Sequence, residues 1–360
     1  MLHRQTDYHL RESRKFRIGL LTLIALLVLA FILGLFCGVG FSLEEVGSFL
    51  IKKLPLIGDK IFREPLAKNI DKVMALRIPR LLLALTVGSG LAVSGALLQA
   101  LFRNPLADPY FLGISAGASF GNTLALVLLP ASLSLLGFGL ASLLAFGFAL
   151  LTMFLVYLLA RTGYRLDLTN LILAGIAVSA ILTAAVSVMM MVARQRLEQI
   201  VLATMGSFSS ATIEKVALVF PAVALGLATA IILSRDLNLF LLGEKEASSL
   251  GLETESRKKL ILGLSSFITS VCVAASGLIW FVGLIVPHFI RLIFGPDHRR
   301  LIPLSALGGA FLLMLADTLA RTLFEPHELP LGILTASLGG PFFLYLLRYK
   351  RNYPFGVRGG

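Results

Sequence analysis

The chain has 360 residues, of which 57% are hydrophobic and only 14% charged, and its mean hydropathy is +0.89. Soluble domains carry about 25% charged residues, so this composition excludes an ordinary soluble protein. The net charge of +12 could suggest a nucleic-acid partner, but the Lys and Arg residues mostly flank apolar runs, as membrane orientation requires, and we expect no nucleic acid.

Apolar runs recur along the chain, and each is close to the length of about twenty residues that a helix needs to cross a bilayer. Inside a bilayer, only helices and closed barrels satisfy every backbone polar group. The runs lack the alternating pattern of barrel strands. The sequence therefore predicts an all-α fold, a polytopic transmembrane bundle of about ten helices.

The predicted spans, in chain order, are 18–40, 79–102, 111–129, 135–160, 171–193, 214–234, 259–278, 279–295, 301–322 and 330–348. They form a single transmembrane domain over 18–348, with cytoplasmic tails at 1–17 and 349–360. The first run follows several basic residues and exceeds the 7–15 residues of a signal-peptide core, so we expect a retained helix with a cytoplasmic N-terminus. An even number of spans places the C-terminus on the same side.

The predicted outer side has two unusual features: a long basic loop, and an acidic residue within a span. Segment 41–78 is expected to be an outer loop although it carries several Lys and Arg residues, because long loops follow the orientation rule less closely. In the ninth span, Asp317 precedes Arg321 by four residues, which places both on one helix face. A local ion pair is our interpretation, and a proton relay through Asp317 is the alternative.

The longest polar interruption on the cytoplasmic side is the loop 235–258. Within it, Gly243 and Gly251 bracket a segment that we expect to form one or two helical turns. Glu244 and Glu246 fall in the first turn, where carboxylates favour the helix dipole, and Gly251 is suited to the helix end. From spacing alone, a solvated loop with an incidental helix is our interpretation, and a docking site for a soluble partner, formed by this shaped and partly apolar element at the membrane surface, is the alternative.

No motif in the sequence indicates catalysis. The chain has no phosphate-binding G-x-x-x-x-G-K-[ST] loop and no H-E-x-x-H zinc motif, and its five histidines are scattered. Cys37 and Cys272 lie within apolar runs and are expected to act as small hydrophobic residues. We expect no metal site and no cofactor bound by this chain. A transporter or channel subunit is the simplest function, and an intramembrane enzyme is a weaker alternative.

Six stretches, in order, resemble the permease subunits of type II ABC importers, the family that takes up iron–siderophores, haem and cobalamin. They are 76–80 (LRIPR), 94–119 (SGALLQALFRNPLADPYFLGISAGAS), 170–175 (NLILAG), 242–251 (LGEKEASSLG), 277–303 (GLIWFVGLIVPHFIRLIFGPDHRRLIP), and 316–343, which opens with ADTLAR. Together they span nearly all of the chain after Leu76. Segment 41–75 is unmatched and looks longer than the usual first outer loop of the family.

The resemblance implies a fold of ten helices and a set of partners. Permeases of this family pair around one central path in the bacterial cytoplasmic (inner) membrane. Two separate ATPase subunits, which hold ATP and Mg²⁺, dock on the cytoplasmic side, and a binding protein delivers substrate from outside. The chain itself would be non-catalytic.

The cargo that the resemblance implies is a metal chelate, with an iron(III)–siderophore as the expected one. Cobalamin or haem carried by the same machinery are alternatives. The alternative of another class is a proton-coupled secondary carrier that works through Asp317.

The resemblance also implies roles for particular residues. The residues that match the ATPase-coupling helix are Gly243, Glu244, Glu246, Ala247, Leu250 and Gly251. Those that match basic positions for docking of the binding protein are Arg77, Arg80 and Arg321. A planar guanidinium group can hold a carboxylate with two hydrogen bonds, which suits such a role. The alternative is that Arg77 and Arg80 are interfacial anchors and that Arg321 only pairs with Asp317.

Two further sets concern the route through the membrane. The candidates for the cytoplasmic gate lie in two loops and are Asn104, Leu106, Leu168 and Thr169. The candidates for the path lining are weakly polar residues of the fifth and tenth spans: Ser179, Thr183, Ser187, Thr335 and Ser337.

Overall fold

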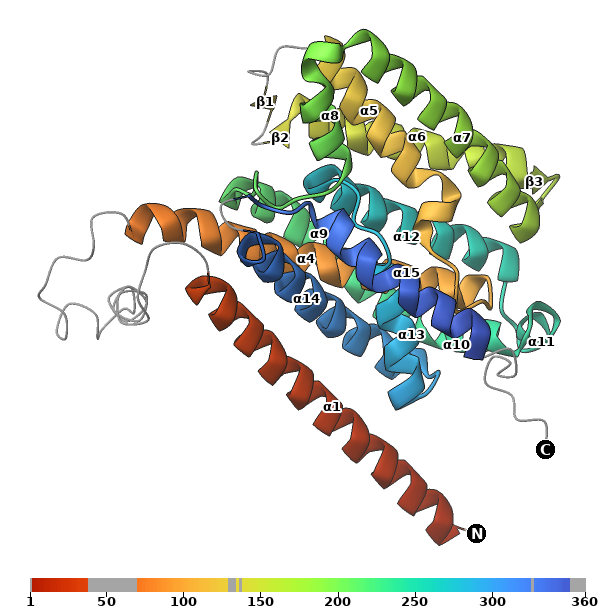
Figure 1. Cartoon of the computed structure of the whole chain (residues 1–360). Helices are drawn as coiled ribbons and strands as arrows, with labels where there is room; N and C mark the ends of the chain where they lie inside the picture. The colour runs from red at the N-terminus through yellow and green to blue at the C-terminus, as the bar shows by residue number, and fades with distance from the viewer. Residues whose placement is uncertain (1, 38–69, 129–133, 136–137, 325–326, 350–360) are drawn as a thin grey trace, which may run out of the picture.

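The computed structural model describes residues 2–37, 70–128, 134–135, 138–324 and 327–349 as a bundle of helices (Figure 1). Ten longer helices correspond to the ten predicted spans: α1 (Leu2–Phe36), α4 (Ile70–Leu101), α5 (Ile114–Leu128), α6 (Leu140–Ala160), α7 (Leu168–Val192), α9 (Ile213–Ile232), α12 (Thr254–Ser276), α13 (Val282–Phe294), α14 (His298–Thr322) and α15 (Leu331–Tyr349). The predicted all-α transmembrane fold is therefore confirmed.

Seven of these helices are long and apolar enough to cross a membrane: α1, α4, α6, α7, α9, α12 and α14. The other three, α5, α13 and α15, are shorter apolar helices. Spans seven and eight are separate helices, as expected. They are divided by residues 277–281, where both Gly277 and Phe281 have positive φ.

Short elements connect the long helices. They are the 3₁₀ helices η1 (Pro109–Leu112) and η2 (Arg194–Arg196), and the α-helices α8 (Leu197–Thr204), α10 (Ser234–Leu242) and α11 (Glu244–Ser249). Two antiparallel pairs of two-residue strands occur in the described residues: β1 (Ser134–Leu135) with β2 (Phe138–Gly139), and β3 (Arg161–Thr162) with β4 (Arg165–Leu166). Neither these strands nor α8 was expected from the sequence.

Helix α4 is the most buried of the spans and packs against α9, α12, α13 and α14. Small residues permit this central position. A Cβ atom on Gly95 of α4 would overlap the carbonyl oxygen of Gly283 of α13, so the two backbones lie in contact. The Ser94 hydroxyl contacts Ser265 Oγ at 2.7 Å and Thr269 Oγ1 at 2.6 Å, both on α12. Small residues therefore allow close packing of α4 against α12 and α13.

Several helices extend beyond the predicted spans. Helix α4 begins at Ile70 rather than near residue 79, because the charged side chain of Arg77 is accommodated inside the bundle and does not end the helix. Residues 70–78 of the predicted outer loop are thus helical, and 41–69 lie outside the described residues. Residues 2–17 of the predicted N-terminal tail form the first part of α1. Of the predicted C-terminal tail, 350–360 lie outside the described residues.

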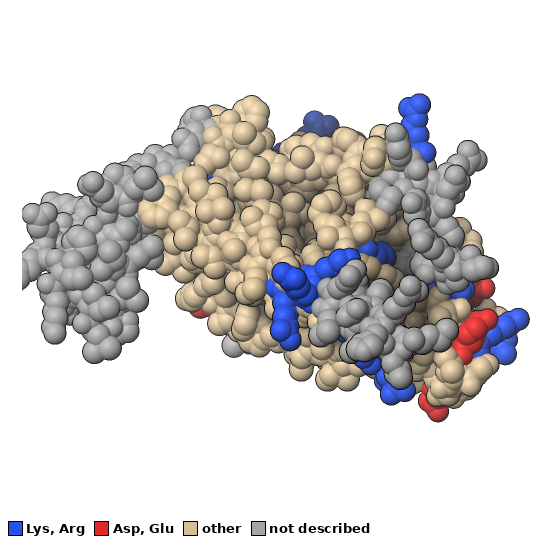
Figure 2. All heavy atoms as spheres, turned by 90° about the horizontal axis from the view of Figure 1, so that it is seen from below, with Lys and Arg blue, Asp and Glu red and all other residues tan. Residues whose placement is uncertain are grey.

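The predicted loop 235–258 is mostly helical. It contains α10, α11 and the first turn of α12, which begins at Thr254 rather than near residue 259. The charged residues of that first turn made the segment look like a loop in the sequence. Their side chains instead form hydrogen bonds and ion pairs with neighbouring elements. Figure 1 places α10, α11 and β3 toward one end of the bundle, and most of the Lys, Arg, Asp and Glu side chains visible in Figure 2 gather toward one side of that view.

Candidate functional site

Helix α11 lies between Gly243 and Gly251, the two glycines that bracket the segment predicted to be helical. At its end, the Gly251 N–H donates to Ser248 O at 2.9 Å, and the Leu252 N–H donates to Ala247 O at 3.1 Å. This pair of bonds is the Schellman arrangement, which needs a left-handed residue, and Gly251 supplies it with a φ of 87°. The predicted helical turns at 244–250 are therefore confirmed, with Leu250 as the C-cap.

One side of α11 faces the protein and the other faces out. Ala247 is fully buried, whereas Leu250 is 62% exposed and Leu242, just before the helix, is 54% exposed. Both leucines lie at the end of the bundle that carries α10, α11 and β3 (Figure 1). Exposed apolar side chains within a polar surface are typical of a contact site for another protein.

A buried lysine joins α11 to the bundle. Lys258 of α12 is 3% exposed, and its Nζ lies 2.7 Å from Glu244 Oε2 of α11 and 2.9 Å from Glu255 Oε1. The other oxygen of Glu255 accepts the backbone N–H of Leu166 in β4 at 2.9 Å. Three elements therefore meet at one charged cluster: the predicted coupling helix, α12 and the hairpin that leads into α7.

Helix α10 has its own connections to the bundle. Asp236 pairs with Arg257 of α12 at 3.2 Å. Asn238 donates to Asp297 Oδ1 at 2.7 Å and accepts the His298 N–H at 2.8 Å, at the start of α14. A displacement of α10 and α11 would thus act directly on α12 and α14.

No motif in the sequence indicates this arrangement. Lys258 is one of several basic residues that flank an apolar span, and local sequence does not distinguish it from the others. The same holds for Glu255, Asn238 and Asp297. The contacts join residues as much as 89 positions apart, from Leu166 to Glu255.

The gate candidates lie in two different settings. The Asn104 side chain accepts the Leu106 N–H at 2.9 Å, which makes a tight turn at the Asn-Pro pair. Leu168 and Thr169 were expected in a loop, but they form the first turn of α7. Asp167 begins that helix by accepting the N–H of Thr169 at 2.8 Å. The gating role of these four residues stays a prediction.

The path candidates divide by exposure. Thr183, Ser187 and Ser337 are exposed on this chain, and Ser179 is half-buried beside Gly113. Thr335 is buried, and its hydroxyl donates to Leu331 O at 3.1 Å, so it faces the interior of the chain. Their role in lining a path stays a prediction.

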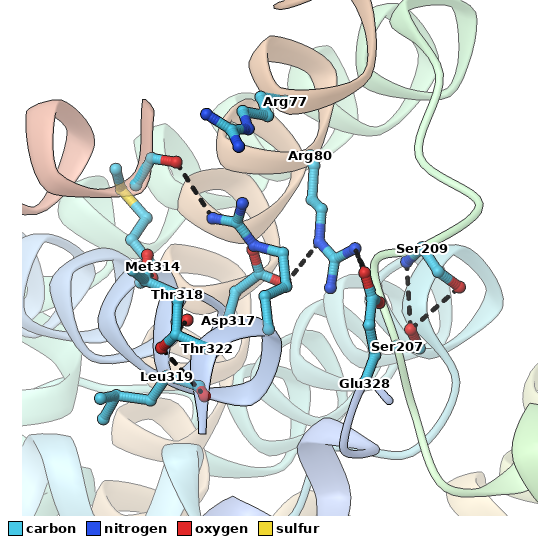
Figure 3. A network of polar contacts seen from close by, with 12 residues as sticks. Arg77, Arg80, Ser207, Ser209, Met314, Asp317, Thr318, Leu319, Thr322 and Glu328 are labelled. Atoms are coloured by element: carbon cyan, nitrogen blue, oxygen red, sulfur yellow. Dashed lines mark hydrogen bonds and ion pairs between the residues drawn. The ribbon is translucent and has the colours of Figure 1, made fainter. Parts of the chain in front are cut away.

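Two of the predicted docking arginines, Arg77 and Arg80, lie in the N-terminal part of α4 (Figure 3), and Arg321 lies in the last turn of α14. Arg80 donates to Asp317 Oδ1 at 2.7 Å and to the two oxygens of Glu328 at 3.0 and 2.9 Å. Arg321 Nε lies 3.2 Å from Asp317 Oδ2, so the expected pair of these residues is confirmed. Arg77 donates to Leu35 O at 2.6 Å.

This cluster is held within the chain. Asp317 is fully buried between Arg80 and Arg321, and the arginine side chains are themselves largely buried. Arg321 also donates to Gly34 O in α1 at 3.1 Å. The cluster therefore joins α1, α4 and α14, and docking of a partner on these arginines stays a prediction.

The comparisons with known proteins agree with this architecture. Residues 25–349 match the model of the FecCD transport family. The chain is 45% identical over 289 residues to the hemin transport system permease protein HmuU of Yersinia pestis, covering 78% of this chain and 84% of that protein. It is 42% identical over 277 residues to the cobalamin import system permease protein BtuC of Halobacterium salinarum, covering 77% of this chain and 73% of that protein.

A solved structure is also similar. It shows an ABC transporter assigned to the metal-chelate type in an inward-facing conformation. The two chains superpose with a TM-score of 0.77 and 33% identity, over 93% of this chain and 99% of the other. With its transmembrane helices and a family match over most of its length, this chain belongs to the FecCD transport family, the permease subunits of type II ABC importers.

Proposed function

We propose that this chain is the membrane permease of an ATP-driven importer that carries a metal chelate inward across the bacterial cytoplasmic (inner) membrane. An iron(III)–siderophore is the proposed cargo. Haem and cobalamin are alternatives, since relatives named for each are similar to this chain to nearly the same degree. The complex would hold a second permease, two ATPase subunits and an external binding protein, and lipid would surround the apolar helices.

The observation that carries the proposal is α11. The helix presents Leu250 outward, and through Glu244 it is bonded to the buried Lys258 of α12. Such an element can receive a push from a soluble partner and pass it to the transmembrane helices. ATP hydrolysis would then belong to that partner.

The contacts suggest how the motion would spread. A shift of α11 would act on α12 through Glu244 and Lys258. It would also reach the start of α7 through Glu255 and Leu166, where the gate candidates Leu168 and Thr169 lie. The outer cluster around Asp317 would keep α1, α4 and α14 together while the cytoplasmic end changes.

Orientation follows from the charges. Basic residues such as Lys245, Arg257 and Arg299 lie on or beside α11, α12 and the start of α14. The positive-inside bias makes this end cytoplasmic, and both termini with it. A reporter fused after Tyr349 that is active only in the cytoplasm tests this directly, and activity of a periplasm-specific reporter there would contradict it.

The replacement Leu250→Asp tests the docking role. Burial of an exposed leucine contributes about 1.5–3 kcal/mol, so its loss should weaken ATPase binding by about tenfold or more. Since Leu250 is exposed in the free chain, folding should be unaffected. Phe324→Asp, at an exposed apolar residue beyond α14, is the matched control. Wild-type ATPase binding by Leu250→Asp would contradict the assignment.

A proton-coupled carrier is less consistent with the geometry. Asp317 is held between two guanidinium groups, which suits a fixed ion pair better than an acid that must take up and release a proton.

A further inference from the structure

A polar cavity of about 440 Å³ lies inside this chain, beside the outer arginine cluster. It is bordered by α5, α6, α8, the segment between α8 and α9, the start of α9, the end of α12 with the residues after it, and the loop before α15. Its polar lining includes Asn122, Ser142, Ser207, Ser210, Lys215 and Glu328. The volume is within the range of about 300–1,000 Å³ that is usual for small-molecule sites.

Lys215 is the charged group that the cavity leaves without a counterion. The residue is 8% exposed, and its Nζ donates to Ser210 Oγ at 3.0 Å. Within the described part of the chain, no carboxylate lies at ion-pair distance from this ammonium group. An ammonium group has three donors, and burial of a charge without an opposite charge is costly. An anion that entered the cavity would supply the missing partner.

Hydrogen-bonding groups on the walls are also available. The Asn122 amide and the Ser142 hydroxyl form no hydrogen bond with another described residue. Ser207 is bonded to Ser209 at 3.1 Å, and Ser209 and Ser210 are exposed at the rim. These groups could bind the oxygen atoms of a polar ligand.

Glu328 does not neutralise Lys215. Both of its oxygens accept hydrogen bonds from Arg80, which also binds Asp317. The positive charges of Arg80 and Arg321 balance the negative charges of Asp317 and Glu328. The cavity therefore keeps the positive charge of Lys215. Figure 3 shows Ser207 and Ser209 close to Glu328, which places the rim beside the predicted docking arginines.

We propose that this cavity is a receiving site that binds a carboxylate-bearing chelate through Lys215 as the chelate arrives at the outer face. The inference rests on the proposed function, because only an importer permease would meet its cargo there. It also narrows the substrate class, since a chelate with free carboxylates would bind more tightly than one without them.

The test is equilibrium dialysis of the detergent-purified complete chain, together with any ATPase that copurifies. The probes are iron(III) citrate and haemin, which carry carboxylates, and cyanocobalamin, which has none. We expect saturable binding of an anionic probe by the wild type and weaker binding of cyanocobalamin. Lys215→Met removes one charged donor and should weaken binding of the anionic probe by about tenfold or more. Lys215→Arg should stay within about threefold, because it keeps the charge.

Lys259→Met, which removes a lysine from the opposite end of the bundle, is the control and should bind like the wild type. Asn122→Leu keeps the side-chain shape but removes the amide, so it should also weaken binding. It provides the test if Lys215→Met fails to fold. Any of three results would overturn the inference. They are wild-type affinity in either cavity variant, no binding of either anionic probe, and binding of cyanocobalamin as tight as that of the anionic probes. If ATPase subunits copurify while the anionic probes do not bind, only this inference fails. If binding is as expected but no ATPase copurifies, the proposed function fails.

Discussion

Lys258 lies beneath the coupling helix α11, with its ammonium nitrogen 2.7 Å from Glu244 and the side chain 3% exposed. The same nitrogen lies 2.9 Å from Glu255, which binds the backbone ahead of α7. One side chain therefore connects the element that would meet the ATPase with two transmembrane helices.

Replacement of this lysine should separate ATP hydrolysis from transport. Lys258→Met leaves Glu244 and Glu255 without their partner, and since both carboxylates are partly exposed and can hydrate, the cost in unfolding free energy should be about 1–2 kcal/mol. Uptake per ATP hydrolysed, measured in proteoliposomes that hold the complete complex, should fall severalfold. Lys258→Arg should restore most of it. An unchanged uptake-to-hydrolysis ratio in Lys258→Met would rule out this connection.

The left-handed end of α11 should depend on glycine. A Cβ atom at Gly251 would meet no neighbouring atom, so the cost of Gly251→Val is conformational, about 1–2 kcal/mol or more. Gly263 in α12 also has open space around it but lies mid-helix, and Gly263→Ala should instead raise stability by about 1 kcal/mol. Thermal unfolding in detergent measures both, and shifts of the same sign would contradict the account.

Asp317 should be needed for stability rather than for proton transfer. Loss of the charge between Arg80 and Arg321 should cost about 3 kcal/mol in Asp317→Asn. Uptake per folded molecule should remain ATP-driven and should not respond to a proton ionophore. Uptake that is abolished in a well-folded Asp317→Asn protein would favour the proton carrier.

Asp108 should make stability depend on pH. Its carboxylate accepts the Tyr110 N–H in the loop before α5. Burial raises the pKa of this carboxyl from 3.8 to about 6, and the Tyr110 bond opposes part of that rise. Between about pH 4 and 6 the folded chain binds more protons than the unfolded chain, so stability falls as the pH rises, by about 3 kcal/mol in total.

The replacement Asp108→Asn tests this dependence. It keeps the acceptor for Tyr110 without the charge, so it should raise the unfolding temperature at pH 8 and change it little near pH 4. A shift of equal size at both pH values would show that the charge of Asp108 is not the cause.

The local features of the chain could be predicted from sequence. The helical turns between Gly243 and Gly251 and the pair Asp317–Arg321 each depend on residues a few positions apart. In the described part of the chain, the ten helices that correspond to the predicted spans followed from hydropathy in the same way, although α5, α13 and α15 are shorter apolar helices. The predicted span 79–102 leaves out residues 70–78 of α4, because the sequence cannot show that α1 offers Leu35 O to the buried guanidinium group of Arg77.

The contacts that connect distant segments could not be predicted. Arg80 and Asp317 are 237 positions apart, and only the packing of α4 against α14 brings them together. Lys258 and Lys215 resemble ordinary flanking charges until burial distinguishes them. Their roles arise from tertiary packing, which periodicity does not encode.

The most direct test is the composition of the intact complex, released gently from its native membrane and weighed by native mass spectrometry. The account predicts two permeases with two ATPase subunits, and loss of the ATPase subunits when Leu250 is replaced by Asp. A complex that reproducibly lacks any ATPase across mild detergents would contradict the central claim and direct attention to Asp317 as a proton-binding residue.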